Sequence, residues 1–221
     1  MMEDDSPLLE LRNIAVAYND HTVLDDLNLS VQRGEFVVLH GKTGCGKSTI
    51  FQLIAGLKQP TRGEIIIAGD RIDQYDDEQR RWLRRSMGVM LQNDSLLTDR
   101  TVLENIMLPA LASDVAIKEA RHRAQLALNK CGIAELADAR PSSLSAGQKQ
   151  LACLARAVIN HPVLILADEP VTHLDVKNAQ SLIDLLGTFA KAGVTVLIAS
   201  HQHLTSPKCP MREITLRTIE D

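Results

Sequence analysis

The residues with the clearest chemistry lie in one glycine-rich string, GKTGCGKS, from Gly41 to Ser48. It fits G-x-x-x-x-G-K-[ST], the phosphate-binding loop, in which glycines let successive backbone N–H groups face the phosphates. Lys47 is expected to reach the β- and γ-phosphates, and Ser48 to place its hydroxyl on Mg²⁺. The residues predicted to hold a nucleotide here are Gly41, Lys42, Thr43, Gly44, Cys45, Gly46, Lys47, Ser48 and Thr49.

A second string, VLILADEP, carries paired carboxylates at the end of an apolar run. Asp168 ends a predicted buried strand, where a carboxylate needs a partner, and we expect Mg²⁺ to be that partner. Glu169 follows directly and is placed to polarise an attacking water as a general base. A well-placed base contributes about 10²–10⁴-fold in rate.

A third string, LSAGQ, runs from Leu144 to Gln148 and has no obvious role at its own phosphate loop. The order of the three strings resembles that of the ATP-binding cassette (ABC) ATPases. The resemblance implies an α/β P-loop NTPase fold with a RecA-like core, an antiparallel β subdomain and an inserted α-helical subdomain. It also implies ATP and Mg²⁺ as cofactors and ATP hydrolysis as the activity.

The same resemblance gives roles to residues that carry no signal by themselves. Gln92 follows a short apolar strand, where the family has a glutamine that senses Mg²⁺ and the γ-phosphate. His201 follows the last core strand, where the family has a histidine on the γ-phosphate. Tyr18 lies beyond the first strand, where an aromatic ring stacks on adenine.

A homodimer is a further implication of the resemblance. In the family, LSAGQ residues, here Ser145, Gly147 and Gln148, complete the site of the opposite subunit, and Asp175 crosses the same interface. Two copies arranged head to tail would enclose two ATP molecules. Four departures from the usual pattern bear on the rate of hydrolysis rather than on ATP binding: Ala146, Leu151, His173 and Gln202.

The elements needed to position these residues can be predicted from hydrophobic periodicity and helix caps. Strands are expected at 8–17, 23–31, 35–40, 64–68, 88–91, 163–167 and 194–199. Helices are expected at 47–56, 76–85, 145–159 and 175–191, with helical segments from 101 to 132 separated by Pro109 and by Ser113-Asp114. Alternation of strand and helix predicts a mostly parallel sheet. We expect one nucleotide-binding domain over 1–221, with a core from 1–91 and 143–221 and a helical lobe at about 92–142.

Composition excludes several other classes of protein. The chain has 221 residues, a formal net charge of -4 and no Lys/Arg-rich run, so no nucleic-acid partner is expected. Its longest apolar runs are far shorter than the roughly 20 residues that span a bilayer, and its first residues lack the features of a signal peptide. Its four cysteines lack metal-ligand spacing, so reduced thiols are expected.

The stretch LLTDRTVLENIMLPAL, from Leu96 to Leu111, resembles the FtsE family of bacterial cell-division cassettes. Lipoprotein-releasing and macrolide-type cassettes are close relatives of that family. The resemblance implies an FtsX-like integral membrane partner and a peripheral position on the cytoplasmic face of the inner membrane. Three classes stay open: a cell-division ATPase, an export or lipoprotein-extraction ATPase, and a weakly hydrolysing ATP-binding scaffold.

The apolar residues after Gln92 suggest where the membrane partner could dock. They include Leu96, Leu97, Val102, Ile106 and Leu108. We expect this run to form a groove for a short helix of the partner, with the lobe's own core as the alternative.

Overall fold

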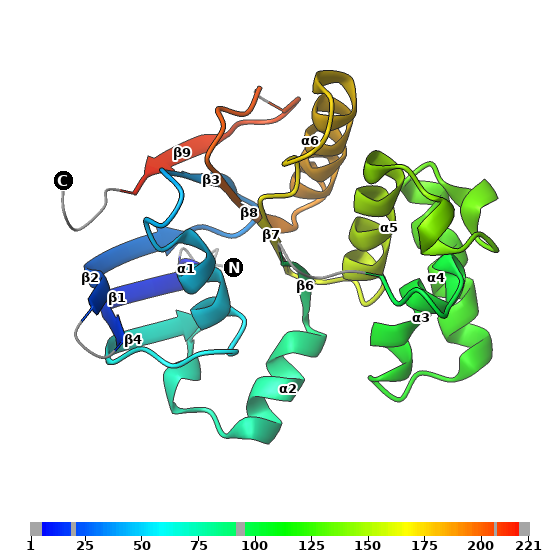
Figure 1. Cartoon of the computed structure of the whole chain (residues 1–221). Coiled ribbons are helices and arrows are strands. Elements are labelled where there is room, and N and C mark those ends of the chain that lie inside the picture. The colour runs from blue at the N-terminus through cyan, green and yellow to red at the C-terminus, as the bar shows by residue number, and fades with distance from the viewer. Residues whose placement is uncertain (1–5, 19–20, 92–95, 206, 217–221) are drawn as a thin grey trace, which may run out of the picture.

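The computed structural model describes residues 6–18, 21–91, 96–205 and 207–216, whose strands form two sheets (Figure 1). The first sheet is antiparallel, with the order β2-β1-β4-β5. Its strands are β1 (Leu9–Tyr18), β2 (His21–Val31), β4 (Arg62–Ile67) and β5 (Asp70–Arg71). The second sheet is parallel, with the order β6-β7-β8-β3-β9. Its strands are β3 (Phe36–His40), β6 (Met87–Met90), β7 (Leu164–Asp168), β8 (Thr195–Ser200) and β9 (Arg212–Thr215).

In the described ranges, six α-helices and three 3₁₀ turns connect the strands. The α-helices are α1 (Lys47–Ile54), α2 (Asp77–Arg85), α3 (Val102–Leu111), α4 (Ile117–Lys130), α5 (Ala146–Val158) and α6 (Val176–Lys191). The 3₁₀ turns are η1 (Ile72–Gln74), η2 (Ala134–Leu136) and η3 (Pro141–Ser143). The predicted α/β class is therefore confirmed. Strands β5 and β9 were not predicted, because one is too short and the other too exposed to show an apolar pattern.

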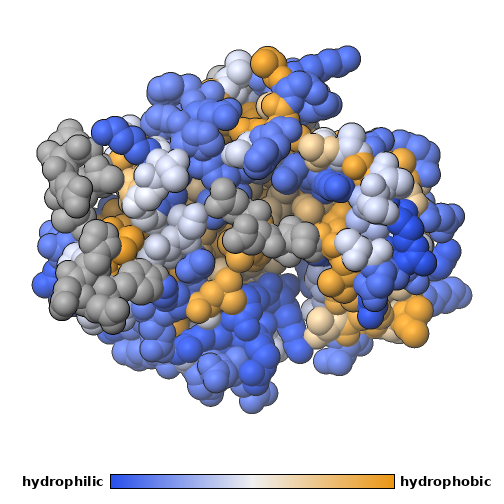
Figure 2. All heavy atoms as spheres, in the orientation of Figure 1, coloured by the Kyte–Doolittle hydropathy of each residue, from blue (hydrophilic) through white to orange (hydrophobic). Residues whose placement is uncertain are grey.

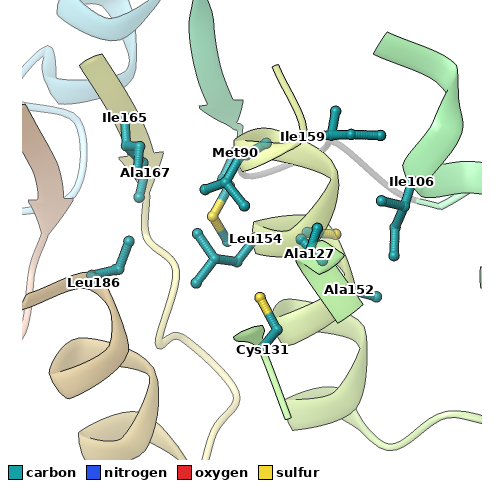
Figure 3. Packing of buried hydrophobic residues seen from close by; sticks show 14 of the residues in the cluster. Met90, Ile106, Ala127, Cys131, Ala152, Leu154, Ile159, Ile165, Ala167 and Leu186 are labelled. Carbon is teal, nitrogen blue, oxygen red and sulfur yellow. The ribbon is translucent and has the colours of Figure 1, made fainter. Parts of the chain in front are cut away.

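The parallel sheet separates two hydrophobic cores, because successive side chains of a strand point to opposite faces. In β7, Leu164 and Leu166 pack with α1 and the antiparallel sheet, whereas Ile165 and Ala167 pack with α5 and α6. Figure 3 shows Ile165 and Ala167 facing Leu154 of α5 and Leu186 of α6. Strands β7 and β8 are buried along their whole length, as expected for a parallel sheet covered on both faces.

Between β6 and α5 the described chain forms the short turns η2 and η3 and the helices α3 and α4, and these two helices pack with each other and with α5 (Figure 1). The expected break at Pro109 is wrong: α3 continues through this residue to Leu111. Pro109 lacks the backbone N–H that would donate a hydrogen bond within α3, but it lies in the last turn of this helix. Its carbonyl is held by Ser113 Oγ at 2.9 Å and by Asn160 Nδ2 at 3.2 Å.

The docking groove expected along Leu96–Leu108 is contradicted for most of its residues. Leu96, Val102 and Ile106 are buried in the core that α3 shares with α4 and α5. Leu97 alone is well exposed, at 44%, and Leu108 is half-buried. Helix α3 faces its own core here because its apolar side chains recur at helical spacing and pack on α4 and α5.

Two further sequence expectations concern membranes and thiols. None of the helices in the described ranges is long and apolar enough to cross a membrane. The four cysteines, which all lie in those ranges, form no disulfide with one another, and Cys45, Cys131 and Cys153 are buried.

Candidate functional site

The phosphate loop lies at the carboxyl end of β3, where the chain turns into α1. Gly46 caps α1 with φ 93°, a left-handed backbone conformation that residues other than glycine rarely adopt. A Cβ there would also lie 2.6 Å from Leu24 Cδ2. The loop and the start of α1 line a cavity of about 220 Å³. Its lining residues are Val23, Thr43, Gly44, Gly46, Lys47, Ser48, Thr49, Glu169 and His201.

Lys47 is buried with its ammonium group inside the curl of the loop. Its Nζ donates hydrogen bonds to the carbonyls of Gly41 at 2.6 Å and Lys42 at 3.0 Å. The third neighbour in this corner is Cys45, whose Sγ lies 4.0 Å from the same Nζ. Two of the three donor hydrogens of the ammonium group therefore hold the loop closed through the Gly41 and Lys42 carbonyls.

Asp168 is the last residue of β7, and its side chain is only 4% exposed. Its carboxylate accepts a hydrogen bond from the Ser48 hydroxyl, but its Oδ1 is buried without a hydrogen-bond partner. Burial raises the pKa of the Asp168 carboxyl, and the charge of Glu169 raises it further against the opposing effects of Ser48 and Lys47. An orphaned carboxylate oxygen beside a serine hydroxyl fits an oxygen-preferring cation such as Mg²⁺.

The described residues contain no cluster of three or more His, Cys, Asp or Glu side chains that could hold a metal by themselves. Ser48 and Asp168 would therefore share a cation with phosphate oxygens and water, which is the usual arrangement for Mg²⁺ at a nucleotide. The site thus fits Mg²⁺ brought in together with a nucleotide.

Glu169 leaves β7 with φ 53°, which turns its side chain away from that of Asp168 and toward the loop. Its Oε2 lies 2.8 Å from His201 Nδ1 and accepts a hydrogen bond from Thr172 Oγ1 at 3.0 Å. Its Oε1 lies 3.7 Å from Lys47 Nζ. The loop lysine, the second carboxylate and the strand-end histidine are therefore brought together at one cavity, although up to 154 residues separate Lys47 from His201 in the chain.

The LSAGQ residues and Asp175 do not line this cavity. Ser145 is exposed and caps α5, accepting a hydrogen bond from the Gln148 backbone at 3.2 Å, while Gln148 Oε1 accepts one from Ser145 N at 2.9 Å. Asp175 caps α6 by accepting hydrogen bonds from Asn178 N at 2.9 Å and Asn178 Nδ2 at 2.6 Å, and these bonds hold the pKa of its carboxyl below the ordinary value.

The N-termini of α5 and α6 lie side by side. A Cβ on Gly147 would lie 3.3 Å from Asn178 Cγ, which places the two helix starts in contact. They form an exposed surface with two sets of N-terminal backbone N–H groups, a favourable place for an anion. This surface is separate from the cavity of its own chain.

Gln92 lies outside the described residues, and β1 ends at Tyr18, whose side chain is likewise not described. The structure adds Val23 and Thr172, which sequence reasoning missed. The sequence held one signal for Thr172: a hydroxyl three residues after Glu169 can reach the Glu169 side chain across a turn. A hydrogen bond from Thr172 N to Glu169 O at 3.3 Å closes this turn.

Comparisons with known proteins give a consistent result. The sequence profile of the family described as "ABC transporter" matches residues 24–172. The cell division ATP-binding protein FtsE of Escherichia coli K12 is 34% identical over 210 residues, covering 95% of both chains. The lipoprotein-releasing system ATP-binding protein LolD of Aquifex aeolicus is 31% identical over 214 residues, covering 96% of this chain and 93% of the relative.

A solved structure shares the fold. It is the dimeric structure of a post-hydrolysis state of the ATP-binding cassette MJ0796, bound to ADP and Pi. Its TM-score is 0.81 at 33% sequence identity, and the match covers 88% of each chain.

Proposed function

The chain belongs to the ABC transporter family and is the ATPase subunit of a transporter complex, and we propose that this complex is of the FtsE–FtsX kind. The ATPase assignment rests on the position of Glu169, which lines the same cavity as the phosphate loop. Glu169 acts as the general base for the attacking water. Lys47 binds the β- and γ-phosphates, and His201 contacts the γ-phosphate from the end of β8. Gln92 and Tyr18 keep their expected roles as γ-phosphate sensor and adenine platform.

Mg²⁺ would be held by Ser48 and Asp168 together with the nucleotide, and it would neutralise charge on the phosphates. The buried, unpartnered Oδ1 of Asp168 supports this assignment. The residues of the chain do the remaining work: the loop orients the phosphates, and the buried Glu169 carboxylate takes a proton from water.

The working unit is a homodimer in which Ser145, Gly147 and Gln148 of one copy face the phosphates held by the other. The exposed start of α5, separate from the cavity of its own chain, supports this arrangement. Asp175 lies at the adjacent start of α6 and crosses the same interface.

The membrane partner, an FtsX-like subunit, docks at a cavity between α2 and the region of α3 and α4, at the cytoplasmic face of the inner membrane. This cavity has a volume of about 260 Å³. It is lined by Trp82, Arg85, Ser86, Ser113, Val115, Arg123 and Asn160. Figure 2 shows a notch in the surface beside the hydrophilic residues of the α2 side. The cavity suits a short partner helix with an acidic side chain, because Trp82 is 69% exposed and the cations Arg85 and Arg123 line the same cavity.

FtsE and LolD are similar to the chain to nearly the same degree, so an export or lipoprotein-releasing role is the second candidate. The two candidates are separated by co-purification with an FtsX-like membrane subunit or with the membrane subunit of a lipoprotein-releasing system. A chain that binds ATP but shows no steady-state hydrolysis would instead be an ATP-binding scaffold.

The ATPase assignment is tested with Glu169→Gln and Lys47→Ala. Glu169→Gln should lower kcat about 10²–10⁴-fold while ATP still binds, because an amide cannot accept the proton. Lys47→Ala should instead weaken ATP binding. Steady-state phosphate release and calorimetric titration measure the two effects. Wild-type turnover by Glu169→Gln would show that another group is the base.

A further inference from the structure

The two carboxylate oxygens of Glu169 have different surroundings. Oε2 accepts the Thr172 hydroxyl hydrogen bond at 3.0 Å and lies 2.8 Å from His201 Nδ1. Oε1 has neither contact and lies 3.7 Å from Lys47 Nζ, next to the phosphate loop. Both lone-pair directions of Oε2 that face the protein are thus used, whereas Oε1 is the oxygen left to face a substrate.

This asymmetry matters because the terminal torsion of a glutamate is soft and nearly two-fold. A carboxylate without fixed partners would rotate and exchange its two oxygens. The backbone holds Glu169 firmly, since its N–H donates to the Ala199 carbonyl at 2.9 Å, but this contact does not set the side-chain torsion. The hydrogen bonds to Oε2 must therefore set the side-chain torsion of Glu169.

His201 and Thr172 differ as partners of Oε2. The His201 side chain is 36% exposed, and its Nε2 lies 3.4 Å from the Gln202 amide nitrogen. His201 must also meet the γ-phosphate in the proposed function. Thr172 is half-buried, and a turn connects it to Glu169 three residues earlier. The proposed function gives Thr172 no contact with the nucleotide.

We propose that Thr172 is a positioning residue that fixes the Glu169 carboxylate so that Oε1 is the oxygen that takes the proton. The proposal rests on the role of Glu169 as general base. The water oxygen forms a bond to the γ-phosphorus while its proton passes to Oε1. The bond from that phosphorus to the β–γ bridging oxygen breaks, and the electron pair leaves with ADP. The proton then passes from Oε1 to phosphate or solvent.

The test is Thr172→Val, which keeps the shape of the side chain and removes the donor. We expect kcat for Mg-ATP to fall about ten- to a hundredfold, the size of effect that a misplaced catalytic group produces. The KM for ATP and the melting temperature should stay at wild-type values. Thr172→Ser restores the hydroxyl and should restore kcat. The matched control is Thr188→Val, because the exposed Thr188 hydroxyl donates only to the Leu185 carbonyl in its own helix.

Three results would overturn the proposal: wild-type kcat in Thr172→Val, no recovery in Thr172→Ser, or a raised KM with unchanged kcat. The Glu169→Gln variant separates this failure from failure of the proposed function. If Glu169→Gln is inactive while Thr172→Val is unaffected, only the role of Thr172 is wrong. If Glu169→Gln turns over at the wild-type rate, the assignment of the base itself is wrong.

Discussion

Asp168 is buried and has a carboxylate oxygen without a hydrogen-bond partner, and a buried, unpartnered carboxylate lowers the stability of the folded protein. Burial raises its pKa above the ordinary value of about 3.9. For a carboxyl whose folded pKa is raised, the stabilising contribution is complete below the unfolded pKa and is lost as pH rises through the folded pKa. At neutral pH Asp168 therefore makes the protein less stable than it is at acid pH when no cation is bound.

Asp168→Asn should consequently be more stable than the wild type at pH 7.5 without nucleotide, by about 1 kcal/mol or more, while losing Mg-ATP hydrolysis. The difference in free energy of unfolding should shrink as pH falls toward about 4. Urea denaturation at several pH values measures it. Asp25→Asn, at an exposed aspartate, serves as the control. If the Asp168→Asn and wild-type stabilities keep a constant difference across this range, the burial argument is wrong.

At the scale of elements, the starts of α5 and α6 determine the proposed dimer contact. Ser145 has a local duty as the N-cap of α5, through a reciprocal pair of hydrogen bonds with Gln148. Replacing it therefore costs about 1 kcal/mol of stability whatever its role between subunits. A test of the contact has to separate these two effects.

In the Glu169→Gln background, Mg-ATP should convert the protein from monomer to dimer. Adding Ser145→Arg should prevent this conversion, because a long side chain at the start of α5 would occupy the phosphate site of the other copy. Ser145→Ala loses the same cap without adding bulk, so it should still dimerise. Multi-angle light scattering with and without ATP gives the masses. Dimerisation by the arginine variant would exclude this face as the contact.

At the scale of the whole molecule, the proposed docking cavity lies between α2 and the region of α3 and α4, away from the phosphate loop. Trp82→Glu and Arg85→Glu should each reduce co-purification of the membrane subunit about tenfold or more, since they place like charge against an acidic partner segment. ATP hydrolysis by the isolated chain should not change. Leu126→Glu, at an exposed leucine of α4 outside the cavity, is the matched control. Unchanged co-purification by both variants would locate the docking site elsewhere.

The sequence by itself determined the phosphate loop, the strand that ends at Asp168, and the positions at which α5 and α6 begin. Each depends on residues close together in the chain: glycines at fixed spacing, a continuous apolar run, and a side-chain oxygen three residues before a helix N–H. The same local patterns placed most strands and helices and indicated the family.

Tertiary structure alone decided which of these residues meet. The pairing of β7 and β8 brings His201 to Glu169, and the contact between β3 and β8 places both beside Lys47. It also decided that Leu96, Val102 and Ile106 lie in a core rather than on a groove, because periodicity marks an apolar face but not what covers it. The partners of Glu169, including Thr172, depend on a left-handed residue at the end of β7, which no local residue preference announces.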